Sequence, residues 1–199
     1  MADISTAKGR VCTGFSKPYV ALYSATGTTV TYSEAQELAR GVSVSLDVET
    51  SDSNDFYANN VKAESESGKF VNGSVTLGVD GLLSAAEKLI MGLPEADTDG
   101  FTAYGDDQSI PYVGVGYITR YVSGGNTSYV PTVLAKCKFA QTTHEANTQE
   151  EEVDYQTQEL SATVERCDDA KHNWKFEGTE YATEAEAETA LKKKLGVTA

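Results

Sequence analysis

Three segments of this chain alternate between apolar and polar residues with a period of two, and this pattern limits the fold more than any other feature. Successive side chains of a strand point to opposite faces, so the alternation is typical of antiparallel strands with one wet face. The apolar members are Val42, Val44, Leu46 and Val48, then Val71, Val75, Leu77 and Val79, then Leu160, Ala162 and Val164. The polar members are Ser43, Ser45, Asp47 and Glu49, then Asn72, Ser74 and Thr76, then Ser161, Thr163 and Glu165.

Further strands are expected where Tyr, Val and Thr recur, since these residues suit a pleated, half-buried surface. The segments are 18–24, 61–66, 111–122, 129–140 and 153–158. Polar stretches between the strands are interpreted as loops, and the stretch SGGNTS as a hairpin turn. These loops cover 50–60, 94–109, 123–128 and 141–152.

Two segments have helical spacing instead. Residues 81–91 place Leu82, Ala86, Leu89 and Ile90 on one face, and we expect Asp80 to cap the start and Gly92 to end the helix. Residues 183–195 begin with a capping box, Thr183 to Glu186, and stop at Gly196. The expected fold is mainly β, with two packed antiparallel sheets like a sandwich or barrel, a flanking helix, a short C-terminal helix and long loops. It forms one domain over 1–199, with 1–17 as an N-terminal arm and 141–152 as a projecting polar arm.

The charge balance bears on the kind of partner. The 199 residues include 16 Lys and Arg against 30 Asp and Glu, a formal net charge of −14. This argues against sequence-specific nucleic-acid binding and against docking on anionic lipid. Three long stretches hold acids but no Lys or Arg: 41–61, 89–119 and 139–165. They are either ordinary solubility charge or a surface that repels anions, which would suit a conduit for nucleic acid.

Residues that could support catalysis or bind a metal are sparse. The two histidines, His144 and His172, stand apart, and no nucleophile elbow, phosphate-binding loop or zinc motif is present. The segment Asp97 to Gly100 resembles the start of a calcium loop, but Phe101 and Gln108 occupy positions that need oxygen ligands. We therefore expect no enzyme activity, no metal and no cofactor. A hydrolase built on an Asp/Glu pair stays open as an alternative.

The three cysteines, Cys12, Cys137 and Cys167, are widely spaced and odd in number. We expect three free thiols, as in a protein made in a reducing cytoplasm. Cys137 is expected to be buried, on one strand face with Val133, Ala135 and Phe139. No apolar stretch is long enough for a membrane span and no leader is recognisable, so no membrane association is expected.

The order of the segments carries a resemblance over about residues 18–196. The pieces are GVSVSLDVETSDSNDFYANN, then VKAESESGKFVNGSVTLGVDGLLSAAEKLIMG, then YVGVGYITRY, then VPTVLAKCKFAQTTHEANTQEEEVDYQTQELSATVER, and finally WKFEGTEYATEAEAETALKKKLG. In this order and spacing the chain resembles the major tail protein, or tail tube protein, of phages with long non-contractile tails. The last piece is similar to the family's closing strand and short C-terminal helix.

The resemblance implies a structural virion protein. Six copies form a ring, one sheet of each copy lines a continuous lumen, and stacked rings make the tail tube through which DNA is ejected. The partners implied are further copies, the tape measure protein, and the tail terminator and tip proteins; DNA passes without specific binding. The N-terminal residues and the long loops bridge neighbouring subunits or rings, and the family has no catalytic residues.

Two other interpretations of the same sequence features remain. The chain could be the tube protein of a contractile tail or bacteriocin-like particle, since that fold is shared. It could also be a β-sandwich module that binds a ligand or decorates a virion, with Tyr112, Tyr117, Tyr121 and Tyr129 as an aromatic platform.

The tail tube hypothesis predicts two functional surfaces, a subunit interface and a lumen wall. Phe56 and Tyr57 stand in a polar loop, where exposed aromatics often anchor an interface. The subunit and ring interface is expected to include Phe56, Tyr57, Asp52, Asp55, His144, Glu150 and Glu151. The acidic lumen is expected to be lined by the polar face of the alternating strands, including Ser43, Ser45, Asp47, Glu49, Ser74 and Thr76.

Overall fold

A computed structural model of the chain describes residues 9–52, 54–66, 68–106, 108–144, 148 and 156–197. Strands hold 52% of the chain, so the fold is mainly β as expected. In order, the elements are β1 (Val11–Thr26), β2 (Thr29–Glu37), β3 (Gly41–Thr50), β4 (Asn54–Ala58), β5 (Val61–Glu66), β6 (Phe70–Val79), α1 (Ser84–Met91), β7 (Val113–Ser123), β8 (Asn126–Phe139), β9 (Gln158–Glu165), β10 (Lys175–Glu177) and α2 (Glu184–Lys194).

All strand pairs are antiparallel, and they form two sheets. The main sheet runs β2-β1-β7-β8-β9-β6-β3, with β10 also paired to β8, and the small sheet is the β4–β5 hairpin. β8 changes neighbours along one edge, because β10 pairs with it at 132–134 and β9 at 136–139. The two packed layers are thus largely halves of one continuous sheet that turns at β8.

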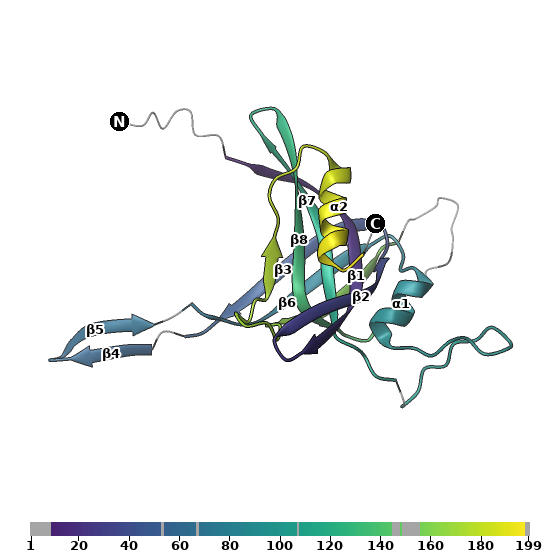
Figure 1. Cartoon of the computed structure of the whole chain (residues 1–199), viewed down its shortest axis with the longest axis horizontal. Coiled ribbons are helices and arrows are strands. Elements are labelled where there is room, and N and C mark those ends of the chain that lie inside the picture. Colours follow the sequence, from purple (N-terminus) through teal and green to yellow (C-terminus); the bar gives the residue numbers. More distant parts are fainter. Residues whose placement is uncertain are drawn as a thin grey trace.

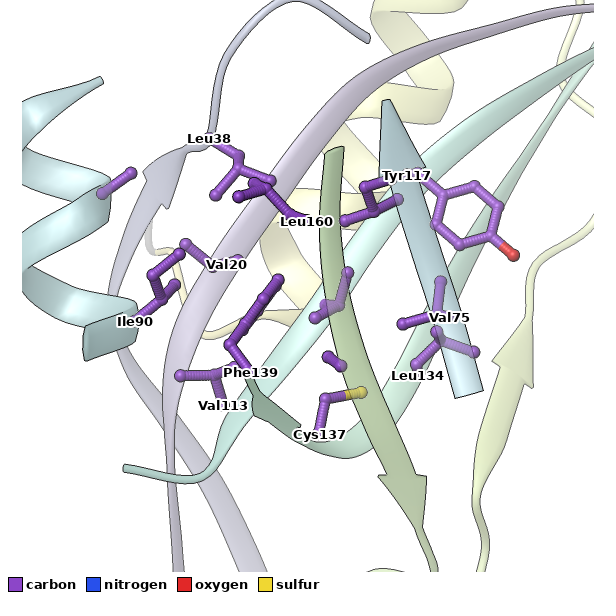
Figure 2. Close-up of a cluster of buried hydrophobic side chains, with 14 of the residues drawn as sticks. Val20, Leu38, Val75, Ile90, Val113, Tyr117, Leu134, Cys137, Phe139 and Leu160 are labelled. Carbon is purple, nitrogen blue, oxygen red and sulfur yellow. The ribbon is translucent and has the colours of Figure 1, made fainter. Parts of the chain in front are cut away.

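The halves meet across an apolar core. Phe15 of β1 lies directly on Gly41 of β3, at a distance that leaves no room for a side chain at Gly41. Figure 2 shows Ile90 of α1 near Val20 of β1, with Phe139 and Cys137 of β8 in the same cluster. Burial of such side chains supplies about 1.5–3 kcal/mol each. The core includes Val20, Leu38, Val75, Leu77, Val79, Ile90, Val113, Leu134, Cys137, Phe139 and Leu160.

α2 covers the opposite face of β1, β7 and β8 (Figure 1). Leu191 and Leu195 pack there against Ile118 and Val133. A side-chain carbon at Gly116 of β7 would lie 2.7 Å from Leu191 Cδ1. The glycine therefore lets the helix approach the strand closely, and the capping box of Thr183 and Glu186 fixes where the helix starts.

The alternating segments are confirmed as β3, β6 and β9, with local changes of face at Val42 and at Val71. Val75, Leu77 and Val79 are buried as expected, but Val71 is 53% exposed and Phe70 is buried. The pairing steps from Glu49–Asn72 to Thr50–Phe70, so Val71 is an extra residue in β6. An extra residue of this kind shifts the alternation by one position, so Val71 no longer lies on the same face as Val75. At the outer strand β3, Val42 and Val48 also remain exposed.

A second bulge corrects the expected surroundings of Cys137. Cys137 is buried and all three thiols are free. However, β7 pairs Val113 with Cys137 and Val115 with Leu134, which leaves one extra residue in β8. Val133 therefore packs against α2, whereas Cys137 and Phe139 face the core between the halves.

Both helices form, and α1 differs at its start. It begins at Ser84 with Leu83 as N-cap and no side-chain cap, so Asp80 is not the cap. The Asp80 carboxylate instead accepts hydrogen bonds from the Arg40 backbone N–H and Nε, which lowers its pKa. Gly92 ends α1 in the left-handed conformation as expected.

Several strands lie where the sequence indicated loops or arms. β1 begins at Val11, so residues 11–17 of the expected N-terminal arm belong to the main sheet, and residues 1–8 of that arm lie outside the described part. β4 occupies 54–58 of the expected loop 50–60, and β2 and β10 were not among the strands expected from periodicity. Of the expected strand 153–158, residues 153–155 are outside the description and 156–157 are not in a strand.

Gly92 provides a test of the α1 terminus. Its φ is 62°, and a side-chain carbon there would lie 2.0 Å from the Ser109 carbonyl oxygen, whereas Gly27 has φ 59° and open space around it. Left-handed backbone alone costs Ala about 1–2 kcal/mol, and overpacking adds about 1–3 kcal/mol. We expect Gly92→Ala to lose clearly more unfolding free energy than Gly27→Ala in urea titrations. Equal losses would mean that Ser109 does not confine this turn.

Candidate functional site: a projecting hairpin and a polar sheet face

The β4–β5 hairpin projects away from the body of the molecule as a separate two-stranded sheet (Figure 1). Its turn is Asn59-Asn60, with φ of 53° and 59°. Asparagine tolerates this left-handed conformation, which the type I′ hairpin turn requires at both positions. Across the hairpin, Asp55 Oδ1 lies 2.7 Å from Lys62 Nζ. The sequence thus forms a defined arm rather than an irregular loop.

Large apolar side chains are exposed on this arm. Phe56 is 64% exposed, Tyr57 62% and Val61 66%. Asp52, just before β4, is exposed and Asp55 is half-buried. An isolated two-stranded hairpin is at best marginally stable in water. An arm with this surface gains stability if a partner covers it.

The other expected interface residues lie elsewhere. Residues 140–144 follow β8, where Thr142 Oγ1 donates to Glu87 Oε1 of α1 at 3.4 Å. α1 and the hairpin are at opposite ends of the molecule (Figure 1), so the structure separates this segment from Phe56 and Tyr57. His144 is exposed there. Glu150 and Glu151 lie outside the described residues.

The second surface is the outer face of one half of the main sheet. We call it the polar half-sheet: β3, β6, β9 and residues 136–139 of β8. The strand register aligns one lateral row across it, Asp47, Ser74, Thr163 and Lys138. All four side chains are exposed. A shallow groove on this face is lined by Asp47, Val48, Glu49, Asn72, Gly73, Ser74, Thr163 and Glu165.

This face bears out the expected alternation but is not purely acidic. Ser43, Ser45, Asp47, Glu49 and Ser74 are exposed, and Thr76 is half-buried. Strand β9 adds Glu159 and Glu165, while β8 adds Lys136 and Lys138. The lysines escaped the sequence prediction because the pairing of β8 with β9 is long-range. The one local indication that Lys136 and Lys138 face outward is their alternation with the apolar Cys137 and Phe139.

Lys136 is held in a network at the rim of the polar half-sheet. Its Nζ lies 3.0 Å from Asp168 Oδ2 and 4.6 Å from the centroid of the Tyr112 ring. Tyr23 Oη donates to the same carboxylate at 2.6 Å, and the Asp168 backbone N–H donates back to Tyr23 Oη at 2.9 Å. The Tyr23 hydroxyl and then Lys136 lower the pKa of Asp168. Burial and then Asp168 raise the pKa of Tyr23 to about 12.

The remaining candidates for chemistry have structural roles or lie exposed. Asp97 Oδ1 accepts from the backbone N–H of Asp99 and Phe101, so it stabilises its own turn. His172 is exposed. Among the described residues, no three His, Cys, Asp or Glu side chains come together as a metal site. Neither described helix is long and apolar enough to cross a membrane.

The four tyrosines of the possible aromatic platform do not share a surface. Tyr117 is 6% exposed and packs edge-to-face on Phe15 in the core, with ring centroids 5.7 Å apart. Tyr121 lies under the Arg10 guanidinium, and Tyr112 lies beside Lys136. Tyr129 packs against the apolar cluster that α2 covers. The structure therefore removes the observation that favoured a binding module.

Comparisons with known proteins add no identification. No protein-family model matches the chain, and no curated protein matches its sequence.

The Asp168 network predicts a pH dependence. A lowered pKa stabilises the fold above the unfolded value of about 3.9, and this contribution is lost as pH falls through the folded-state pKa. We expect Tyr23→Phe to raise the pKa of Asp168, measured by NMR titration. We also expect the difference in unfolding free energy between the wild type and Tyr23→Phe to become smaller below about pH 4.

Tyr32→Phe is the matched control. Tyr32 packs on Tyr23 with ring centroids 6.0 Å apart, but its hydroxyl donates to the Ala135 carbonyl. The control should leave the Asp168 titration unchanged. An unchanged titration in Tyr23→Phe as well would refute the assigned cause.

Proposed function

We propose that this chain is a structural virion protein, a tail tube protein that assembles into stacked hexameric rings and forms a conduit for DNA ejection. The observation that carries the proposal is the β4–β5 arm, a separate hairpin whose aromatic pair is largely exposed in the described structure. The segment resemblance to the tail tube family supports the hexameric ring, the tape measure, terminator and tip partners, and location in the virion tail.

The position of the arm favours contacts between unlike surfaces. It projects from one end of the molecule, with α1 and its loops at the other (Figure 1). A contact between a projecting arm and a different surface of the next copy is heterologous, and such contacts generate rings if they close and open-ended filaments if they do not. Both modes are needed to build a tube.

The polar half-sheet suits a channel wall. It bears four carboxylates, Asp47, Glu49, Glu159 and Glu165, against two lysines, and Lys136 is already paired with Asp168. Hydroxyl groups fill the rows between them. Phosphates that meet such a wall make few ion pairs and release few condensed counterions, so DNA slides without adhering. At about 0.15 M salt, repulsion acts within about 8 Å of the wall.

The arm is tested by removing its two rings. We expect the double variant Phe56→Ala and Tyr57→Ala to remain a folded monomer with wild-type melting behaviour, because the arm lies outside the core. Negative-stain microscopy should show no rings or tubes, since aromatic anchors often contribute about 2 kcal/mol or more to an interface.

The exchange variant Phe56→Tyr and Tyr57→Phe keeps both rings and serves as control. It should assemble as the wild type does. Normal tubes from the double alanine variant would count against the arm as an interface.

The channel wall is tested at its centre. Replacing Ser74 and Thr163 with Lys adds two positive charges per copy to neighbouring strands, and each new phosphate contact strengthens DNA binding in a salt-dependent way. We expect assembled variant tubes to retain duplex DNA and to slow its passage. Ser74→Thr with Thr163→Ser preserves charge and should behave as wild type; equal DNA retention by both variants would contradict a lumen position.

A further inference from the structure

The two lateral edges of the polar half-sheet carry opposite charges. The register places Asp47 of β3 opposite Ser74 of β6, Ser74 opposite Thr163 of β9, and Thr163 opposite Lys138 of β8. This row therefore starts with an acid and ends with a lysine. In the next row Glu49 lies opposite Asn72, so the acid at the β3 edge recurs, whereas Lys136 on the β8 side has Glu165 opposite it.

Among the described residues, these charges have no ion-pair partner, although Lys138 Nζ lies 5.5 Å from the centroid of the Tyr112 ring. Neighbouring strands are about 4.8 Å apart, so three spacings separate Asp47 from Lys138 by about 14 Å. Within the described part of the chain, neither Asp47, Glu49 nor Lys138 forms an ion pair. Lys136 differs, because Asp168 already holds it at 3.0 Å. The charges left to act on a partner are the acids of β3 and Lys138 of β8.

Both edges lie at lateral ends of the polar half-sheet. β3 is the last strand of the main sheet, and β6 is the one described strand that pairs with it. On the other side β7 begins at Val113 opposite Cys137, so β8 carries Lys138 past the end of β7. The half-sheet has four antiparallel strands, an even number. Placing β3 of one copy beside β8 of the next therefore continues the antiparallel alternation.

We propose that the acidic edge of one copy, Asp47 with Glu49, pairs electrostatically with Lys138 of the next copy, which sets the direction and register of ring closure. The partner is a second copy of this chain, identified by charge complementarity between the two edges. This inference rests on the proposed function and deepens it. A reversed neighbour would place acid beside acid and lysine beside lysine, which costs free energy at each boundary.

Charge reversal tests this pairing. Asp47→Lys alone and Lys138→Glu alone should each fold as wild type, because both side chains are exposed. Each should raise the critical concentration for assembly at least about fivefold, since reversal turns an attraction into a repulsion at every boundary. Sedimentation at 50 mM and 500 mM salt should show this difference shrinking at the higher salt.

Mixing the two variants gives the sharpest readout. In an equimolar mixture, Lys at position 47 of one variant faces Glu at position 138 of the other, and the unaltered Asp47 faces the unaltered Lys138. A six-membered ring can alternate the two, so the mixture should assemble at near wild-type concentration although neither variant does so alone. Glu34→Lys and Lys171→Glu change the same charges on exposed residues away from these edges and should not affect assembly.

The outcomes separate this inference from the proposed function. Wild-type chains that assemble while both single variants assemble equally well would overturn the edge pairing and leave the tube intact. Single variants that fail without rescue in the mixture would also overturn the pairing, because a defect in folding or in another contact would explain them. Wild-type chains that remain monomeric in every condition would overturn the tube and this inference together.

Discussion

The structure depends on how β8 is shared between the two halves of the main sheet. Residues 130–135 are buried without interruption, because α2 covers one face and the core covers the other. At residue 136 the strand passes from pairing with β10 to pairing with β9. The bulge near this point keeps Leu134 and Cys137 on the same side despite their odd spacing. One extra residue therefore directs the apolar faces of both halves inward.

That inward turn determines which residues are left for function. Once Val75, Leu77 and Val164 are buried, the alternate positions of β3, β6 and β9 must face outward together. A wide face of hydroxyl groups and carboxylates forms, with a shallow groove between Asp47 and Glu165. The β4–β5 arm, which the core does not support, carries the exposed aromatic rings. Both surfaces suit contact with other molecules better than chemistry on a small ligand.

Much of this arrangement could be predicted from local patterns, and the rest could not. Period-two alternation placed β3, β6 and β9, and capping chemistry placed α2, because both signals lie within a few residues. The bulges at Val71 and in β8 follow from cross-strand register, which no local window contains. The sequence of β2 is too polar to show an apolar alternation, and β2 forms through its antiparallel pairing with β1. The sequence predicts a loop at the position of the arm because polar residues surround Phe56 and Tyr57. Lys136 and Lys138 lie on the polar half-sheet because β8 pairs with β9, which is distant in sequence.

We propose that copies of this chain form rings with the polar half-sheet toward the channel. Cryo-electron microscopy of the purified full-length protein, concentrated at about 0.15 M salt, tests this most directly. We expect six-fold rings or tubes in which Ser74 and Thr163 line the lumen, α2 lies on the outside, and the β4–β5 arm contacts a neighbouring copy. A protein that stays monomeric at all concentrations, or a ring whose channel is lined by α2, would contradict it.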